Sequence, residues 1–110
     1  PMHVSVSHSF DCSPEVFWRK VFFDAAYNDA LFKGHLGFPE YRLVSTDEKP
    51  DRIARHVHVM PPQKAPEIVR KLAKGTLTYE EHGTWTASDG VYWAEDVWSG
   101  DSKIWRVKFE

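Results

Sequence analysis

Apolar and polar residues alternate at the start of the chain, and this pattern predicts a strand followed by helices. Over His3–Phe10, apolar residues share one face and serines the other, which is typical of a half-buried strand. Ser13–Glu15 predicts a helix start, because serine caps free amides, proline suits the first turn and glutamate complements the positive end. A second helix is expected over Asp24–Phe32, with Gly34 and Gly37 ending it.

From residue 41 onward, the period of two predicts an antiparallel sheet. Turn residues at 49–51, 88–90 and 99–101 separate the strands, and a short helix is expected over Ala65–Lys74. The predicted strands cover Tyr41–Thr46, Arg52–Met60, Leu77–Trp85, Val91–Trp98 and Lys103–Phe109. We therefore expect an α+β fold in which a curved antiparallel sheet of about six strands has two short helices after its first strand.

Composition narrows the classes of protein that fit this pattern. Hydrophobic residues make up 42% of the 110 residues and charged residues 27%, which indicates a globular chain. The net charge is −2, with basic and acidic residues interleaved, so we expect no nucleic-acid partner. No apolar run approaches the roughly 20 residues that span a bilayer. Cys12 is the single cysteine, which favours a cytoplasmic location.

The order of elements and several short motifs resemble a known superfamily. The opening strand, the Ser13–Phe17 helix start and the second helix directly after it are similar to the START-like (SRPBCC) superfamily. Three further segments resemble a bacterial START-like family of unassigned function: an arginine-containing strand that ends in Met-Pro, a short helix, and a Thr-Trp strand. These are Val57–Pro61 with Lys64–Pro66, Val69–Leu77, and Glu81–Trp85. Residues 3 to 98 take part in the resemblance, which implies a helix-grip fold with a ligand between the sheet and a long C-terminal helix.

The end of the chain departs from that pattern. Glu110 follows a predicted strand directly, and the long closing helix is absent. We expect a single START-like domain over residues 2–110, with Met2 as the native start. Two explanations stay open: the C-terminus is truncated, or the domain is a compact variant whose pocket a second copy closes. An open apolar sheet face would favour such association.

The main functional hypothesis is binding or transport of a hydrophobic small molecule, without a cofactor. Aromatic residues reach 15%, and ligand pockets are mostly apolar and aromatic, although large side chains also fill small cores. The candidate ligand-binding residues are Phe17, Phe22, Tyr27, Leu43, Arg55, Val57, Val59, Leu77, Tyr79, Glu81, Trp85, Trp93 and Trp105. Trp93 competes with a rival apolar row on its own strand, formed by Tyr92, Ala94 and Trp98.

Two charged residues fall on predicted apolar strand faces. Arg55 shares the parity of Ile53 and Val57, so it either anchors the acidic group of a ligand or lies at the sheet rim in contact with water. Glu81 has the parity of Tyr79. It either pairs with Arg55 or occupies a bend of its strand near glycine 83.

The sequence gives less support for a metal site or a catalytic cysteine. His56 and His58 share a strand face, and His8, His82 or Glu80 would have to complete a zinc site; an exposed outer face explains them as well, and we expect no metal. Cys12 has no identifiable base. The alternatives to a carrier are a self-associating module and a cyclase- or hydrolase-type enzyme of the same superfamily, which would use Arg55, Glu81 or Tyr79.

Overall fold

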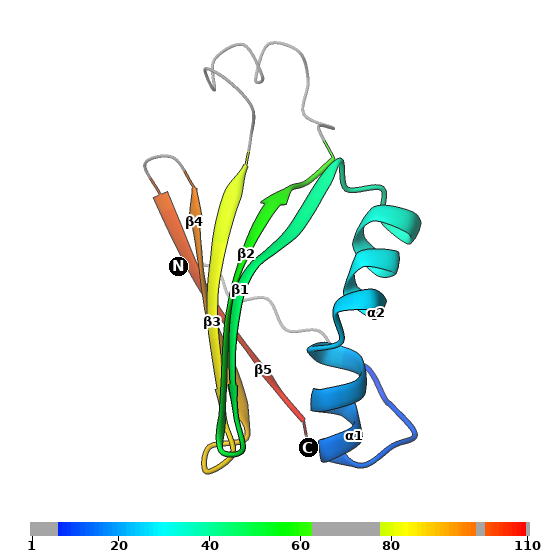
Figure 1. Cartoon of the computed structure of the whole chain (residues 1–110), viewed down its shortest axis with the longest axis vertical. Coiled ribbons are helices and arrows are strands. Elements are labelled where there is room, and N and C mark those ends of the chain that lie inside the picture. The colour runs from blue at the N-terminus through cyan, green and yellow to red at the C-terminus, as the bar shows by residue number, and fades with distance from the viewer. Residues whose placement is uncertain (1–6, 63–77, 99–100, 110) are drawn as a thin grey trace.

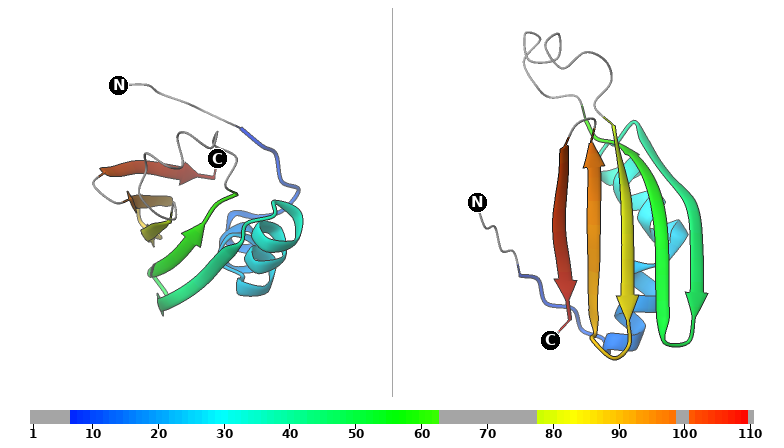
Figure 2. Two further views of the ribbon diagram at one scale, coloured as in Figure 1. Left: turned by 90° about the horizontal axis from the view of Figure 1, so that it is seen from above. Right: turned by 90° about the vertical axis from the view of Figure 1, so that its left-hand side faces the viewer.

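The computed structural model describes residues 7–62, 78–98 and 101–109, and within them the fold is α+β. Five antiparallel strands form one open sheet in the order β1-β2-β3-β4-β5, so each strand pairs with its neighbour in sequence (Figures 1 and 2). The strands are β1 (Glu40–Lys49), β2 (Arg52–Met60), β3 (Tyr79–Thr86), β4 (Val91–Trp98) and β5 (Asp101–Lys108).

The helical segments precede the sheet in sequence and lie on one face of it (Figure 1). They are α1 (Pro14–Val16) with η1 (Phe17–Phe22), and α2 (Ala25–Asp29) with η2 (Ala30–His35). Both predicted helix starts are confirmed. Ser13 Oγ accepts from the Val16 amide at 3.3 Å, and Asp24 Oδ2 accepts from the Tyr27 amide at 2.8 Å.

The second half of each helical pair is wound as a π-helix. The Phe23 amide donates to the carbonyl of Trp18 at 3.0 Å, five residues earlier, and the Leu36 amide donates to the carbonyl of Leu31 at 2.8 Å. The last carbonyls of a helix lack partners within that helix. The carbonyl of Phe22 is therefore available to side chains from outside the helix.

Strand register places one row of each strand under these helices. The first core cluster consists of Phe17, Trp18, Ile53, Trp85, Tyr92 and Ala94. The second, near the other end of β1 and β2, consists of Tyr41, Val57 and Val59 with Phe32, Phe38 and Tyr79 packed against it. The helix-facing side of the sheet is therefore the apolar face, as the alternation predicts.

Strand β1 contains a β-bulge at Val44. Leu43 pairs with Val57 and Ser45 with His56, which leaves Val44 as an extra residue in the ladder. Such a bulge bends its strand and increases the local twist. Val44 itself is exposed.

Two sequence predictions are wrong, and others lie outside the described residues. The predicted first strand is not formed in its described part, Ser7–Phe10, where the Phe10 ring packs 5.0 Å from that of Phe17 instead. The second helix continues through Gly34 to His35, and of the two glycines predicted to end it only Gly37 adopts a left-handed φ, of 71°. The helix predicted over residues 65–74 and Leu77 lie outside the described residues.

Candidate functional site

A buried charged cluster lies on the helix-facing side of the sheet, where β2, β3 and β4 run side by side. Arg55 and Glu81 side chains are only 8% and 9% exposed. Arg55 Nη2 donates to Glu81 Oε2 at 3.1 Å, and Arg55 Nε donates to the Tyr92 hydroxyl at 3.0 Å. Tyr92 Oη in turn donates to Glu81 Oε2 at 2.7 Å. The rim position considered for Arg55 is therefore wrong, and of the two alternatives for Glu81 the structure shows the pairing with Arg55.

Gly83 makes this cluster possible. It pairs with Arg55 on one side and Ala94 on the other, and the Tyr92 side chain crosses directly over it. A Cβ built on Gly83 would lie 1.8 Å from Tyr92 Oη. A residue with a side chain at this position would push Tyr92 away from its two partners.

Aromatic rings and a helix end cover the guanidinium from above. The Arg55 guanidinium carbon lies 4.7 Å from the Phe22 ring centroid and 5.2 Å from that of Phe23, within the range of cation–π attraction. Arg55 Nη1 donates to the Phe22 carbonyl at 3.2 Å, which also accepts from Asn28 Nδ2 at 2.7 Å. The negative end of η1 therefore complements the buried cation.

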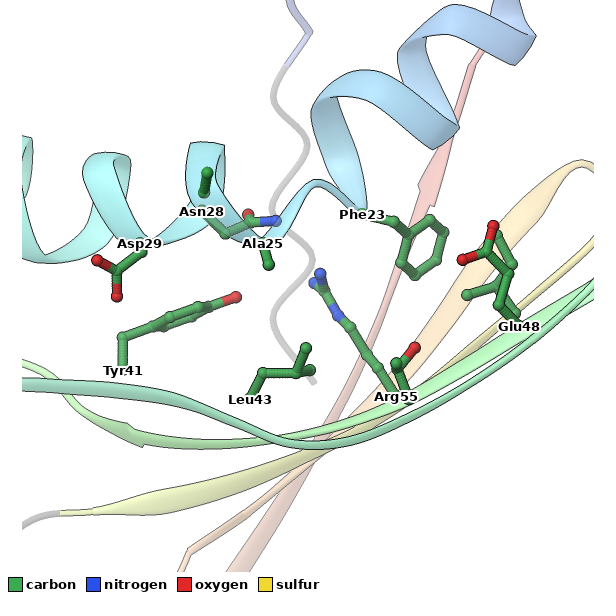
Figure 3. A pocket seen from close by; sticks show the side chains of 11 residues that line it. Phe23, Ala25, Asn28, Asp29, Tyr41, Leu43, Glu48 and Arg55 are labelled. Atoms are coloured by element: carbon green, nitrogen blue, oxygen red, sulfur yellow. The ribbon is translucent and has the colours of Figure 1, made fainter.

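A cavity of about 490 Å³ opens beside this cluster, between α2 and the strands β1 and β2 (Figure 3). It is lined by Phe23, Ala25, Ala26, Asn28, Asp29, Tyr41, Leu43, Thr46, Glu48, Ile53 and Arg55. Figure 3 shows the Arg55 guanidinium and the Tyr41 hydroxyl pointing into the same space above Leu43. Leu43 is 41% exposed there, so part of the apolar wall is accessible.

A second carboxylate lies next to the charged cluster. Asp96 pairs with Glu81 in the β3–β4 register, and its Oδ2 accepts from Trp105 Nε1 at 2.9 Å. Burial, reinforced by the neighbouring Glu81 carboxylate, raises the pKa of Asp96 to about 7. Asp96 does not line the cavity, so this group is adjacent to it rather than part of its wall.

The structure separates the sequence-predicted residues into groups. Leu43 and Arg55 line the cavity, and Glu81 holds Arg55 from below. A larger group belongs to the packed core or its margin: Phe17, Phe22, Val57, Val59, Tyr79, Trp85 and Trp105. Trp85 also lines a smaller cavity of about 310 Å³, together with Trp18, Arg19 and Phe109.

Two predicted residues lie away from the site. Trp93 is 46% exposed on the opposite face, where its Nε1 donates to Asp89 and its ring lies under Arg106. The rival row is the inward one, because Tyr92 and Ala94 are buried. Tyr27 is 43% exposed on α2 and does not line the cavity.

Several site residues were not predicted from the sequence. Tyr41 and Tyr92 were missed as site residues. Alternation along its strand could reveal the inward direction of Tyr41, whereas Tyr92 competes with the adjacent Trp93 and needs the pairing with β3. Phe23 and Asn28 depend on where η1 ends and α2 begins, and no short sequence signal marks that position.

The histidines predicted to share a face lie on the opposite, outward side of the sheet. Glu80 contacts His56 Nε2 at 2.8 Å and His58 Nδ1, and His58 Nε2 contacts Glu40 at 2.9 Å. The rings of His56 and His82 stack with centroids 4.3 Å apart. Hydrogen bonds that the ring of His58 donates to the Glu80 and Glu40 carboxylates raise the pKa of His58. Within the described residues, no His, Cys, Asp and Glu side chains are grouped as a metal site would need.

The residues suggested for catalysis all contact other side chains of the protein. Arg55 and Glu81 neutralise one another, and Tyr79 packs against Trp98 with ring centroids 4.5 Å apart. Burial, with the nearby Asp96 and Glu81 carboxylates, moves the pKa of Tyr79 well above its usual value. The phenol of Tyr79 therefore stays protonated at neutral pH.

Comparison with known proteins places the chain in a family. A family of proteins of unknown function, DUF2505, matches residues 5–105. The chain belongs to the DUF2505 family. No curated protein and no solved structure matches it. In the described part of this DUF2505 protein, no helix has the length and apolar character to cross a membrane.

Proposed function

We propose that this DUF2505 protein binds a hydrophobic small molecule in the cavity between α2 and strands β1 and β2. The observation that carries the proposal is the cavity itself. Its volume of about 490 Å³ falls in the range of known small-molecule sites, and mostly apolar walls with a few polar groups are typical of them. The helices on one face of a curved sheet also support a START-like, helix-grip origin.

The exposed apolar wall of the cavity supports a binding role. Leu43 remains 41% exposed on the wall, although the same face carries enough large aromatic residues to form a packed core elsewhere. The cavity also lies against Arg55, a charged residue that is expensive to bury. A bound apolar molecule would cover Leu43 and fill the gap.

The test uses a neutral fluorescent probe, N-phenyl-1-naphthylamine, titrated into the purified protein. We expect saturable fluorescence enhancement with wild-type protein. Ala26→Trp, which fills the cavity from α2, should weaken binding at least tenfold. Ala30→Trp is the matched control, because Ala30 is exposed on η2 and does not line the cavity.

The outcome can contradict the proposal in two ways. Wild-type protein could give no saturable enhancement and carry no copurified apolar ligand in native mass spectrometry. Alternatively, both tryptophan variants could weaken the probe equally, which would place its binding elsewhere.

Self-association is a second candidate function, supported by a different surface. Trp93, Val97 and Ile104 are exposed on the outward face of β4 and β5, and Ile104 is 70% exposed. Apolar side chains gathered on one face favour association with a partner, here a second copy. Light scattering that shows a monomer at high concentration would contradict this function. A cytoplasmic location fits both candidates, since the single cysteine forms no intrachain disulfide.

A further inference from the structure

We infer that the cavity selects a ligand with a neutral carbonyl group, such as a ketone or an amide, over one with a carboxylate. This inference rests on the proposed function and deepens it. It comes from two hydrogen-bond donors that point into the cavity and from the balance of charges around them.

The first donor is the hydroxyl of Tyr41. The Tyr41 ring is buried and stacks on Phe32, with centroids 4.3 Å apart and planes 4° from parallel, so its direction is fixed. Its hydroxyl has no hydrogen-bond partner among the described residues, and Figure 3 shows it directed into the cavity. Burial raises the pKa of Tyr41, so the group stays protonated and able to donate.

The second donor is the Arg55 guanidinium, which carries five N–H groups. Three donate to protein acceptors: the Tyr92 hydroxyl, the Phe22 carbonyl and Glu81. Within the described part of the chain, the remaining two N–H groups of Arg55 have no acceptor. Because Arg55 lines the cavity (Figure 3), these N–H groups and the Tyr41 hydroxyl can converge on one ligand oxygen.

The charges around the cavity favour a neutral carbonyl oxygen of a ligand over a carboxylate oxygen. The positive charge of Arg55 is already neutralised by Glu81 at 3.1 Å. Two carboxylates also line the cavity, Asp29 and Glu48, and each has its own partner: Lys33 at 3.0 Å and Arg19 at 2.7 Å. A ligand carboxylate would therefore add an unpaired negative charge in a partly buried site, which is costly. A neutral carbonyl accepts the same hydrogen bonds without that cost.

The experiment compares three ligands that share one ring system: 2-acetylnaphthalene, 2-naphthoate and 2-ethylnaphthalene. Affinities are measured by calorimetry at pH 7.5. We expect the ketone to bind about tenfold more tightly than the ethyl compound, as two ordinary hydrogen bonds allow, and more tightly than the carboxylate.

Two variants separate the hydrogen bonds from apolar contact. Tyr41→Phe keeps the ring that stacks on Phe32 and removes the hydroxyl, so ketone affinity should fall about fivefold while that of 2-ethylnaphthalene stays unchanged. Tyr27→Phe is the control, because Tyr27 is exposed and lies outside the cavity wall. Thermal unfolding of each variant confirms that it is folded.

The outcomes distinguish this inference from the proposed function. A carboxylate that binds as tightly as the ketone, or a Tyr41→Phe variant with unchanged ketone affinity, would overturn the inference and leave apolar binding in place. Failure of all three compounds to bind a protein that does bind N-phenyl-1-naphthylamine would overturn the inference alone, and failure of all four compounds would overturn both.

Discussion

Strands β2 and β3 carry a charged cluster on each face of the sheet, built from residues that are neighbours in sequence. Arg55 and Glu81 meet on the helix-facing side, and His56 and Glu80 meet on the outward side. The inner pair is at most 9% exposed, whereas the His56 and Glu80 side chains are 27% and 37% exposed. The two clusters have similar geometry and differ in access to water, so they should differ in how much stability each partner controls.

The largest expected difference follows from removing one acid on each face. Glu81→Ala leaves the buried Arg55 charge without its counterion, which should lower the free energy of unfolding by about 3–5 kcal/mol. Glu80→Ala removes an acid that water can replace, so its loss should stay within about 1 kcal/mol. Urea unfolding measures both variants. Similar losses would contradict the comparison.

The next effect concerns how the inner cluster is accommodated. Gly83→Ala places a methyl group 1.8 Å from Tyr92 Oη and should cost about 1–3 kcal/mol, because the ring must move in a packed core. Gly34→Ala is the matched control, since nothing lies within 4 Å of its Cβ position. It should be neutral or stabilising by about 0.4–1 kcal/mol. A destabilised Gly34→Ala beside a tolerated Gly83→Ala would contradict the assigned close approach.

The inner face can also be tested through pH. The pKa of Asp96 is about 7 in the folded protein, above its ordinary value of 3.8, so the folded state binds a proton that the unfolded state has lost. Stability should therefore fall as pH rises from about 4 to about 7. Asp96→Asn should flatten this fall while the amide still accepts from Trp105. An unchanged pH profile in thermal unfolding would contradict the role of this carboxyl.

The smallest expected effect lies on the outward face. The pKa of His58 is raised above 6.5 by its two glutamates. Its contribution to stability should be complete below pH 6.5 and disappear as pH rises through the higher folded pKa. For an exposed ion pair this amounts to less than about 1 kcal/mol. His58→Asn should remove that decline at alkaline pH, and a variant that retains it would show that another group is responsible.

Strand pattern explains what the sequence could predict. Turn residues on either side marked Arg52–Met60 and Val91–Trp98 with the bounds that the structure shows, and parity put Arg55 and Glu81 each on the apolar face of its strand. The sequence did not show which side chains point toward the helices where both faces of a strand carry aromatic residues, as on β4. There, only the pairing with β3 shows that Tyr92, rather than Trp93, faces the helices.

The rest of the site depends on contacts between distant segments. The reach of Tyr92 across Gly83 requires knowledge of the β3–β4 register. The position of Phe23 and Asn28 over the cavity requires the place where η1 gives way to α2. The space itself is a difference between the volume that the backbone encloses and the volume that side chains fill, and local patterns do not report this difference.

The extra residue in β1, Val44, sets the curvature of one wall of the cavity. Because Leu43 pairs with Val57 and Ser45 with His56, a strand without Val44 would still direct Leu43 and Thr46 toward the helices. Deleting Val44 would thus preserve the chemical groups of that wall and alter only the curvature of the strand that carries them. Under the proposed function, gaining or losing this one residue would change the size of the molecule that fits the cavity while the side chains on its wall stay the same.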